Sequence, residues 1–190
     1  MSDVQVPKAP KTGKIVTIFG SSRPTEGSKE YEDAELLGKK LSAAGISVCT
    51  GGYRGIMEAV SKGAALSDAQ IVGVTSAIFS PTPNKYVNMQ VHTQSLYERL
   101  QKLVELGDGY IILKGGTGTL VEFSLVWELM NKSFIREKPI IVVTDFWQPI
   151  VDLLDKELAF EGLESCTKYV TIAKDASEAA TIMITSLLGK

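Results

Sequence analysis

The sequence predicts an α/β domain built on an open parallel sheet with helices on both faces, and three observations support this fold class. Short apolar runs rich in β-branched residues alternate with longer helical patterns along the chain. The strand runs are apolar almost throughout, as in sheets that are buried on both sides. Glycine-containing turns follow three of the strands, at the edge where open α/β sheets bind ligands.

The expected elements follow from these patterns. We expect strands at residues 14–20, 46–50, 70–75, 109–114, 138–144 and 169–173. We expect helices at residues 28–45, 55–66, 94–107, 117–133, 147–159 and 177–189. Gly45 is the expected C-cap of the first helix, and Pro149 is expected to interrupt its helix near the start. Segment 76–93 is expected to be a long loop with a short strand near 89–91.

The length of 190 residues suits one domain, and we find no internal repeat or interdomain linker. We therefore expect a single domain over residues 14–190, preceded by a disordered tail over residues 1–13 that contains two prolines. No run is apolar and long enough to span a bilayer, and the N-terminus lacks the apolar core of a secretory signal. These features predict a cytoplasmic protein.

Composition excludes several classes of partner. Net charge is −2 and no block of Lys or Arg stands out, which argues against nucleic acid or an anionic membrane as the main partner. Cys49 and Cys166 lie far apart in no metal-binding pattern, so we expect reduced thiols. His92 is the only histidine, which rules out a site with several histidine ligands, and we expect no bound metal. A small anionic ligand remains compatible with this composition.

The three glycine-containing turns read GSSRPTEGS, TGGYRG and KGGTGT. Neither the dinucleotide fingerprint G-x-G-x-x-G nor the Walker A motif is present. KGGTGT nevertheless has the chemistry of a phosphate site, because glycines expose backbone N–H groups and a helix N-terminus follows. Thr117 and Thr119 add hydroxyl donors. The alternative is a tight turn in which threonine caps the helix.

Two charged residues fall on apolar sides of their expected helices. At about 100° per residue, Glu122 projects between Val126 and Leu129, and Arg99 lies beside Leu103. A carboxylate in that position requires a partner or a ligand. The helix that carries Arg99 precedes a parallel strand, so Arg99 and Glu122 approach the same sheet edge. The alternative is a buried ion pair with a purely structural role.

The motifs around these residues resemble those of the LOG (Lonely Guy) family, phosphoribohydrolases that activate cytokinins and are often labelled possible lysine decarboxylases. KGGTGTLVE (114–122) is similar to the family signature P-G-G-x-G-T-x-x-E, and TGGYRGIMEAVSKGA (50–64) to its G-G-G-x-x-G-L-M-G segment. IFGSSRP (18–24) resembles its first G-S-S turn, and LYERL (96–100) its H-E-R-K helix. The motifs keep the family order over roughly residues 14–160, which identifies the chain as a divergent member.

The resemblance implies a Rossmann-like nucleotide-binding domain that hydrolyses the N-glycosidic bond of a nucleoside 5′-monophosphate to free base and ribose 5-phosphate. Arg99 and Glu122 match the catalytic pair. The matching ligand-binding residues are Gly20, Ser21, Ser22, Gly51, Gly52, Met57, Gly115, Gly116, Thr117, Gly118 and Thr119. The resemblance requires no metal or organic cofactor, and we find no pyridoxal phosphate site that would support lysine decarboxylation.

Departures from the family pattern keep a second function open. Lys114 stands where the family has a proline, Leu100 where it has a lysine, and Tyr97 where it has a histidine. Three further positions at which the family usually has glycine are occupied by Pro24, Thr50 and Glu58. The alternative is a protein that binds a nucleotide or phosphorylated cofactor without cleaving it, such as a molybdenum-cofactor carrier. We also expect a homodimer, because helix 117–133 is apolar over most of its circumference.

Overall fold

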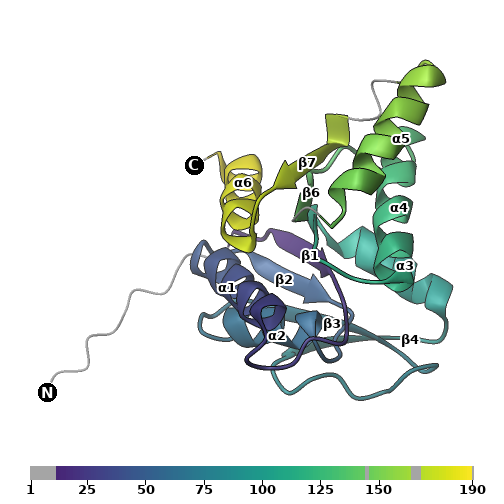
Figure 1. Ribbon diagram of the computed structural model, residues 1–190. Helices are drawn as coiled ribbons and strands as arrows, with labels where there is room; N and C mark the ends of the chain where they lie inside the picture. Colours follow the sequence, from purple (N-terminus) through teal and green to yellow (C-terminus); the bar gives the residue numbers. More distant parts are fainter. Residues whose placement is uncertain (1–11, 144–145, 164–167, 190) are drawn as a thin grey trace, which may run out of the picture.

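The computed structural model describes residues 12–143, 146–163 and 168–189. They form a single α/β domain with one seven-stranded sheet in the order β4-β3-β2-β1-β5-β6-β7, and every strand pairing is parallel (Figure 1). The predicted fold class is therefore confirmed. The expected disordered tail, apart from its last two residues, and Cys166 lie outside the described residues.

The strands are β1 (Ile15–Phe19), β2 (Ser47–Thr50), β3 (Ile71–Ser76), β4 (Met89–Thr93), β5 (Gly109–Ile112), β6 (Ile140–Val143) and β7 (Val170–Ala173). The helices are α1 (Lys29–Ala43), α2 (Ile56–Ala64), α3 (Leu96–Leu106), α4 (Thr117–Asn131), α5 (Gln148–Phe160) and α6 (Ala176–Leu188). The chain builds β2, β3 and β4 on one side of β1 and then crosses to β5 on the other side. This reversal places a topological switch point beside β1, where ligands bind in open α/β sheets.

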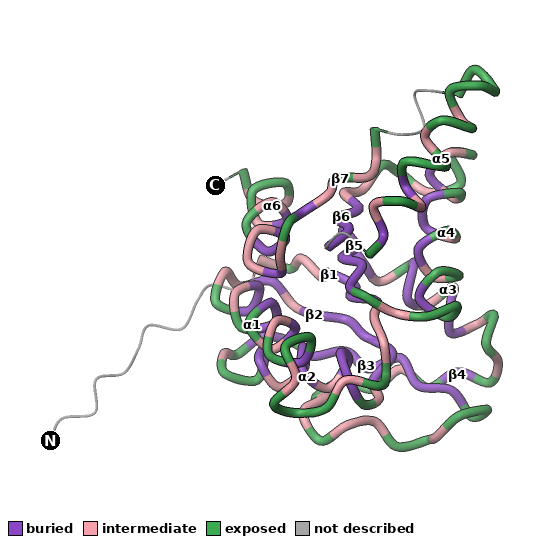
Figure 2. Tube along the Cα trace, viewed as in Figure 1, coloured by how far each residue is buried: buried purple, intermediate pink, exposed green. Residues whose placement is uncertain are grey.

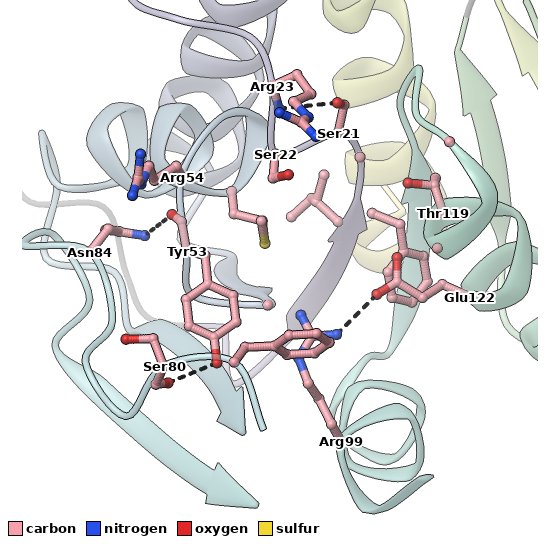
Figure 3. Close-up of a pocket in the computed structure, with 18 of the residues that line it drawn as sticks. Ser21, Ser22, Arg23, Tyr53, Arg54, Ser80, Asn84, Arg99, Thr119 and Glu122 are labelled. Carbon is pink, nitrogen blue, oxygen red and sulfur yellow. Dashed lines mark hydrogen bonds and ion pairs between the residues drawn. The ribbon is translucent and has the colours of Figure 1, made fainter. Parts of the chain in front are cut away.

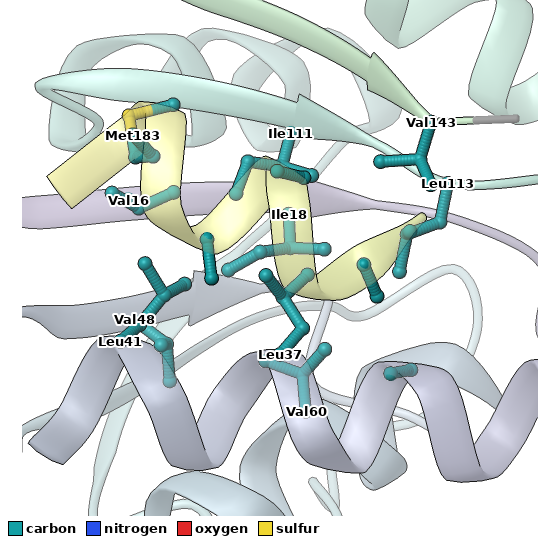
Figure 4. Close-up of a cluster of buried hydrophobic side chains, with 14 of the residues drawn as sticks. Val16, Ile18, Leu37, Leu41, Val48, Val60, Ile111, Leu113, Val143 and Met183 are labelled. Carbon is teal, nitrogen blue, oxygen red and sulfur yellow. The ribbon is translucent and has the colours of Figure 1, made fainter. Parts of the chain in front are cut away.

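Two apolar cores cover the two faces of the sheet. Alternate side chains of β1 and β5, including Val16, Ile18 and Ile111, pack against α1, α2 and α6 (Figure 4). Their neighbours in sequence, including Phe19 and Ile112, pack against α3, α4 and α5 on the opposite face. All residues of β5 and β6 are buried, as expected for strands covered on both sides (Figure 2).

Side chains cap three of the helix starts. The hydroxyls of Ser28 and Ser95 and the carboxylate of Asp175 accept backbone N–H groups at the starts of α1, α3 and α6. α2 and α4 begin instead at Gly55 and Gly116, and neither glycine provides a side-chain cap. Both of these starts lie at the carboxyl edge of the sheet. The first N–H group of α2, that of Ile56, donates to Ser21 O, so the start of α4 is the one suited to a ligand.

Two details differ from expectation. The strand expected near 89–91 runs to Thr93, because all five of its residues pair with β3 and make β4 an edge strand. The prediction that Pro149 interrupts its helix is wrong: α5 begins at Gln148 and Pro149 lies in its first turn. Proline is accepted there because first-turn N–H groups have no partner within the helix.

Candidate active site

A cleft of about 900 Å³ opens at the carboxyl edge of the sheet, beside the switch point (Figure 3). The turns that follow β1, β2 and β5 form its walls, together with α3, α4 and the segment that follows β3. The three glycine-containing turns that the sequence singles out therefore meet at one place.

The start of α4 forms one end of the cleft. Gly116, Thr117, Gly118 and Thr119 line it. A Cβ atom at Gly115 would overlap with the Thr119 hydroxyl, so this tight turn requires glycine at that position. The uncapped N–H groups and the positive end of the helix dipole make this end suited to a phosphate.

The turn after β1 is held against the other two turns by backbone hydrogen bonds. Ser21 N donates to Lys114 O at 3.1 Å, and Ile56 N donates to Ser21 O at 2.9 Å. Gly55, with φ of +68°, approaches this turn so closely that a Cβ atom there would meet the Ser21 and Ser22 backbone. Ser21 and Ser22 consequently line the same cleft as the start of α4.

Arg99 is buried where α3 reaches the cleft. Its Nε donates to Val74 O at 3.0 Å, and its guanidinium carbon lies 5.8 Å from the ring centroids of both Tyr53 and Phe79. A Cβ atom at Gly51 would overlap with the Arg99 guanidinium, so glycine at that position makes room for the arginine. The guanidinium is thus fixed by a carbonyl, two aromatic rings and a glycine turn.

Glu122 projects from the second turn of α4 toward Arg99. Its Oε1 lies 3.5 Å from Arg99 Nη1, and the side chains of Arg99 and Glu122 are 9% and 12% exposed (Figure 3). Burial raises the pKa of Glu122 to about 7, and the nearby Arg99 charge opposes this rise only in part. At neutral pH the carboxyl group therefore populates both protonation states, as a general acid or base requires.

The structure places most of the predicted residues on one cleft. Those lining it are Gly20, Ser21, Ser22, Gly51, Met57, Arg99, Gly116, Thr117, Gly118, Thr119 and Glu122. Gly52 is not among the lining residues; it adopts φ of +76° and packs against the Gly73 backbone. Gly115 lines a smaller adjoining cavity instead.

Sequence reasoning did not single out the residues at the aromatic and polar end of the cleft, which are Tyr53, Arg54, Phe79, Ser80 and Asn84. The Tyr53 hydroxyl accepts from Ser76 N at 2.8 Å and donates to Ser80 O at 2.9 Å. The Asn84 amide donates to Tyr53 O at 3.0 Å (Figure 3). These bonds tie the segment after β3 to the turn after β2. Tyr53 and Arg54 lie within the glycine-containing turn TGGYRG, but no sequence pattern indicates that Phe79 lies at the cleft.

Within residues 12–143, 146–163 and 168–189, no group of three or more His, Cys, Asp or Glu side chains could hold a metal ion. None of the helices in these ranges is long and apolar enough to cross a membrane. Cys49 is buried as a free thiol, and burial raises its pKa to about 12. Glu122 is the only carboxyl group among the described residues that line the cleft.

A sequence model of the SLOG cluster4 family matches residues 13–179. The chain belongs to the SLOG cluster4 family. This match spans all three glycine turns and both Arg99 and Glu122, and it confirms the predicted resemblance to LOG-type proteins.

Curated relatives of this protein are named as nucleotide-cleaving enzymes. It is 28% identical over 178 residues to a cytokinin riboside 5′-monophosphate phosphoribohydrolase from Rhodococcoides fascians, covering 88% of each chain. It is 30% identical over 189 residues to a pyrimidine/purine nucleotide 5′-monophosphate nucleosidase from Escherichia coli K12. That alignment covers 91% of this chain and 40% of the longer nucleosidase.

Solved structures point to a second class of relative. A molybdenum cofactor binding protein from Rippkaea orientalis is 26% identical and superposes with a TM-score of 0.68, covering 90% of this chain and 94% of that one. The molybdenum cofactor carrier protein from Chlamydomonas reinhardtii has a TM-score of 0.71 at 20% identity, with 93% and 99% covered, and shares the fold.

Proposed function

We propose that this protein hydrolyses the N-glycosidic bond of a nucleoside 5′-monophosphate, giving the free base and ribose 5-phosphate. The observation that carries the proposal is the buried Glu122 carboxyl, with its pKa raised to about 7, 3.5 Å from Arg99 in a cleft that also contains an uncapped helix start. The names of the curated relatives support the same reaction.

In this proposal the 5′-phosphate binds at the start of α4, beside Ser21 and Ser22. Breaking the C1′–N bond sends the electron pair to the base and develops positive charge on the ribose. The ionised Glu122 carboxylate stabilises that charge and takes a proton from the attacking water, whose oxygen forms the new C1′–O bond. Return of that proton to the departing base balances the reaction.

Arg99 serves two purposes in this scheme. Its charge limits the rise of the Glu122 pKa, so that a useful fraction of the carboxylate is ionised near neutral pH. Its guanidinium also lies beside the Tyr53 and Phe79 rings, where it can donate a hydrogen bond to the departing base. The proposed reaction needs no metal or organic cofactor and suits the cytoplasm, where nucleotides are available and thiols stay reduced.

A panel assay tests the proposal. Purified protein is incubated with purine and pyrimidine nucleoside monophosphates, and free base and ribose 5-phosphate are measured by chromatography. The proposal predicts release of both products in a one-to-one ratio for at least one nucleotide, with many turnovers per protein molecule. Recovery of every nucleotide intact would overturn it.

The second candidate function is a non-catalytic carrier of a phosphorylated cofactor, which the likeness to a molybdenum cofactor binding protein favours. The same cleft and helix start would hold such a ligand without cleaving it. This function predicts tight binding of a phosphorylated ligand in calorimetry and no turnover in the panel assay.

We further propose that the protein is a homodimer. Phe123, Trp127 and Met130 of α4 are buried against the protein's own sheet, but its opposite side leaves Val121 47% exposed. The next helix, α5, buries only Val151 fully among its described residues and leaves other large apolar side chains exposed. A second copy would cover this surface. Light scattering at micromolar concentration should give the mass of a dimer, and the mass of a monomer would contradict the proposal.

A further inference from the structure

A second cavity of about 510 Å³ adjoins the main cleft. Ser21 and Arg23 line both cavities, so the two spaces share one wall. The turn after β5 is divided between them: Lys114 and Gly115 line the smaller cavity, and Gly116 lines the main cleft. A group bound at the start of α4 therefore lies next to the entrance of the smaller cavity.

The described residues that line the smaller cavity carry two cations and one carboxylate. Arg23 and Lys114 supply the positive charges and Glu30 the negative charge. The other described lining residues are the neutral side chains of Ser21, Pro24, Thr25, Ser28, Gly115 and Phe146. The cavity is therefore suited to an anion, to which Arg23 and Lys114 can donate charge-assisted hydrogen bonds.

Lys114 is positioned to exchange its present partner for a ligand. Its Nζ lies 3.6 Å from Glu30 Oε1, and the two side chains are 54% and 45% exposed. Such an exposed ion pair contributes little and is easily replaced. The lysine backbone, in contrast, is fixed, because Lys114 O accepts from Ser21 N at 3.1 Å. The amino group also lies 5.8 Å from the Phe146 ring centroid, which keeps it over the cavity wall.

We propose that this smaller cavity is a second phosphate subsite, in which Lys114 and Arg23 bind the β-phosphate of a nucleoside 5′-diphosphate. The α-phosphate of that ligand occupies the start of α4, so this inference rests on the proposed function of the main cleft. An α-phosphate bound at the start of α4 has an oxygen that can carry a second phosphoryl group. The cavity that contains Lys114 adjoins the cleft at Ser21 and Arg23, so this second group can extend toward Lys114.

Calorimetric titration with adenosine 5′-monophosphate and 5′-diphosphate tests this subsite, at constant ionic strength and with chelator present. The Glu122→Gln variant serves as the background so that turnover does not disturb the binding curves. We expect the diphosphate to bind about tenfold more tightly than the monophosphate, the size of one charge-assisted contact. Adding Lys114→Gln should lower that affinity ratio to about three, because Arg23 still contacts the β-phosphate, and Lys114→Arg should restore it.

Lys132→Gln is the matched control, because Lys132 is 56% exposed and lies 3.8 Å from Glu128, much as Lys114 lies near Glu30. This control should leave the affinity ratio at about ten. A diphosphate that binds no more tightly than the monophosphate would overturn the proposal, as would an unchanged ratio in Lys114→Gln. The ratio does not depend on turnover, so failure of the wild-type protein to cleave any nucleotide would refute the proposed reaction separately.

Discussion

Replacing Glu122 with glutamine should make the protein more stable at high pH while removing its proposed activity. Burial raises the pKa of Glu122 from the ordinary value of 4.5 to about 7, even with Arg99 beside it. The folded protein therefore binds this proton more tightly than the unfolded chain does. By linkage, the wild-type protein loses stability as pH rises from about 4.5 to about 7, and the loss is complete above that range.

The size of this effect follows from the pKa. A change from 4.5 to about 7 corresponds to roughly 3 kcal/mol, at about 1.4 kcal/mol for each tenfold change in proton affinity. The Glu122 side chain is 12% exposed, so contact with water makes roughly 3 kcal/mol an upper bound on the effect. We expect the free energy of unfolding of Glu122→Gln to exceed that of the wild-type protein by about 1–3 kcal/mol at pH 8. At pH 4 both states bind the proton, and the gain should nearly vanish.

Urea denaturation at pH 4 and pH 8 measures the difference, at one fixed protein concentration. With an m value of about 2 kcal/mol per molar urea, the midpoint at pH 8 should rise by about 1 M in Glu122→Gln. Glu128→Gln is the control: this carboxylate lies on the exposed side of the same helix and should show no comparable gain. A Glu122→Gln midpoint that is unchanged or lower at pH 8, or a gain that is equal at both pH values, would show that the folded protein does not raise the pKa of Glu122.

Three further predictions concern the cleft. Phe79→Ala should raise KM for nucleotides about tenfold, because it removes a surface on which the base can stack. Inhibition by ribose 5-phosphate, which carries no base, should stay unchanged. Equal effects on KM and on this inhibition would contradict a position of Phe79 beside the base. Gly51→Ala should lower kcat about a hundredfold or more, because its Cβ atom would displace the Arg99 guanidinium; circular dichroism should show an intact fold, and normal turnover would contradict this prediction. The rate at low substrate concentration should rise with pH through about 7 as Glu122 ionises. The pH profiles of Glu122→Asp and Arg99→Lys also test this assignment. A wild-type profile that is flat from pH 5 to 9 would contradict it.

The sequence predicted the fold and the position of the site because both depend on local patterns. Alternating apolar strands and helices predicted the parallel sheet, and glycine turns at strand ends predicted the edge at which the cleft lies. Glu122 and Arg99 were identifiable because each is a charged residue on the apolar side of a helix, and the structure brings them within 3.5 Å.

The rest of the cleft depends on contacts between segments that are distant in sequence. Phe79 lies over Arg99 because Tyr53 and Asn84 tie the segment after β3 to the turn after β2. Gly51 is needed for space around the Arg99 side chain rather than for its own conformation. No local pattern encodes either relationship, because both require the folded positions of three separate turns.

The most direct test of the central claim compares binding and turnover in the wild-type protein and Glu122→Gln at pH 7, using the best nucleotide from the panel. Binding is measured by calorimetry for the variant, and release of ribose 5-phosphate is measured for both proteins. We expect Glu122→Gln to bind the nucleotide with about micromolar or better affinity but to release product at least about a hundredfold more slowly than the wild-type protein. Equal rates in the two proteins, or a wild-type protein that binds the nucleotide and never cleaves it, would contradict the account.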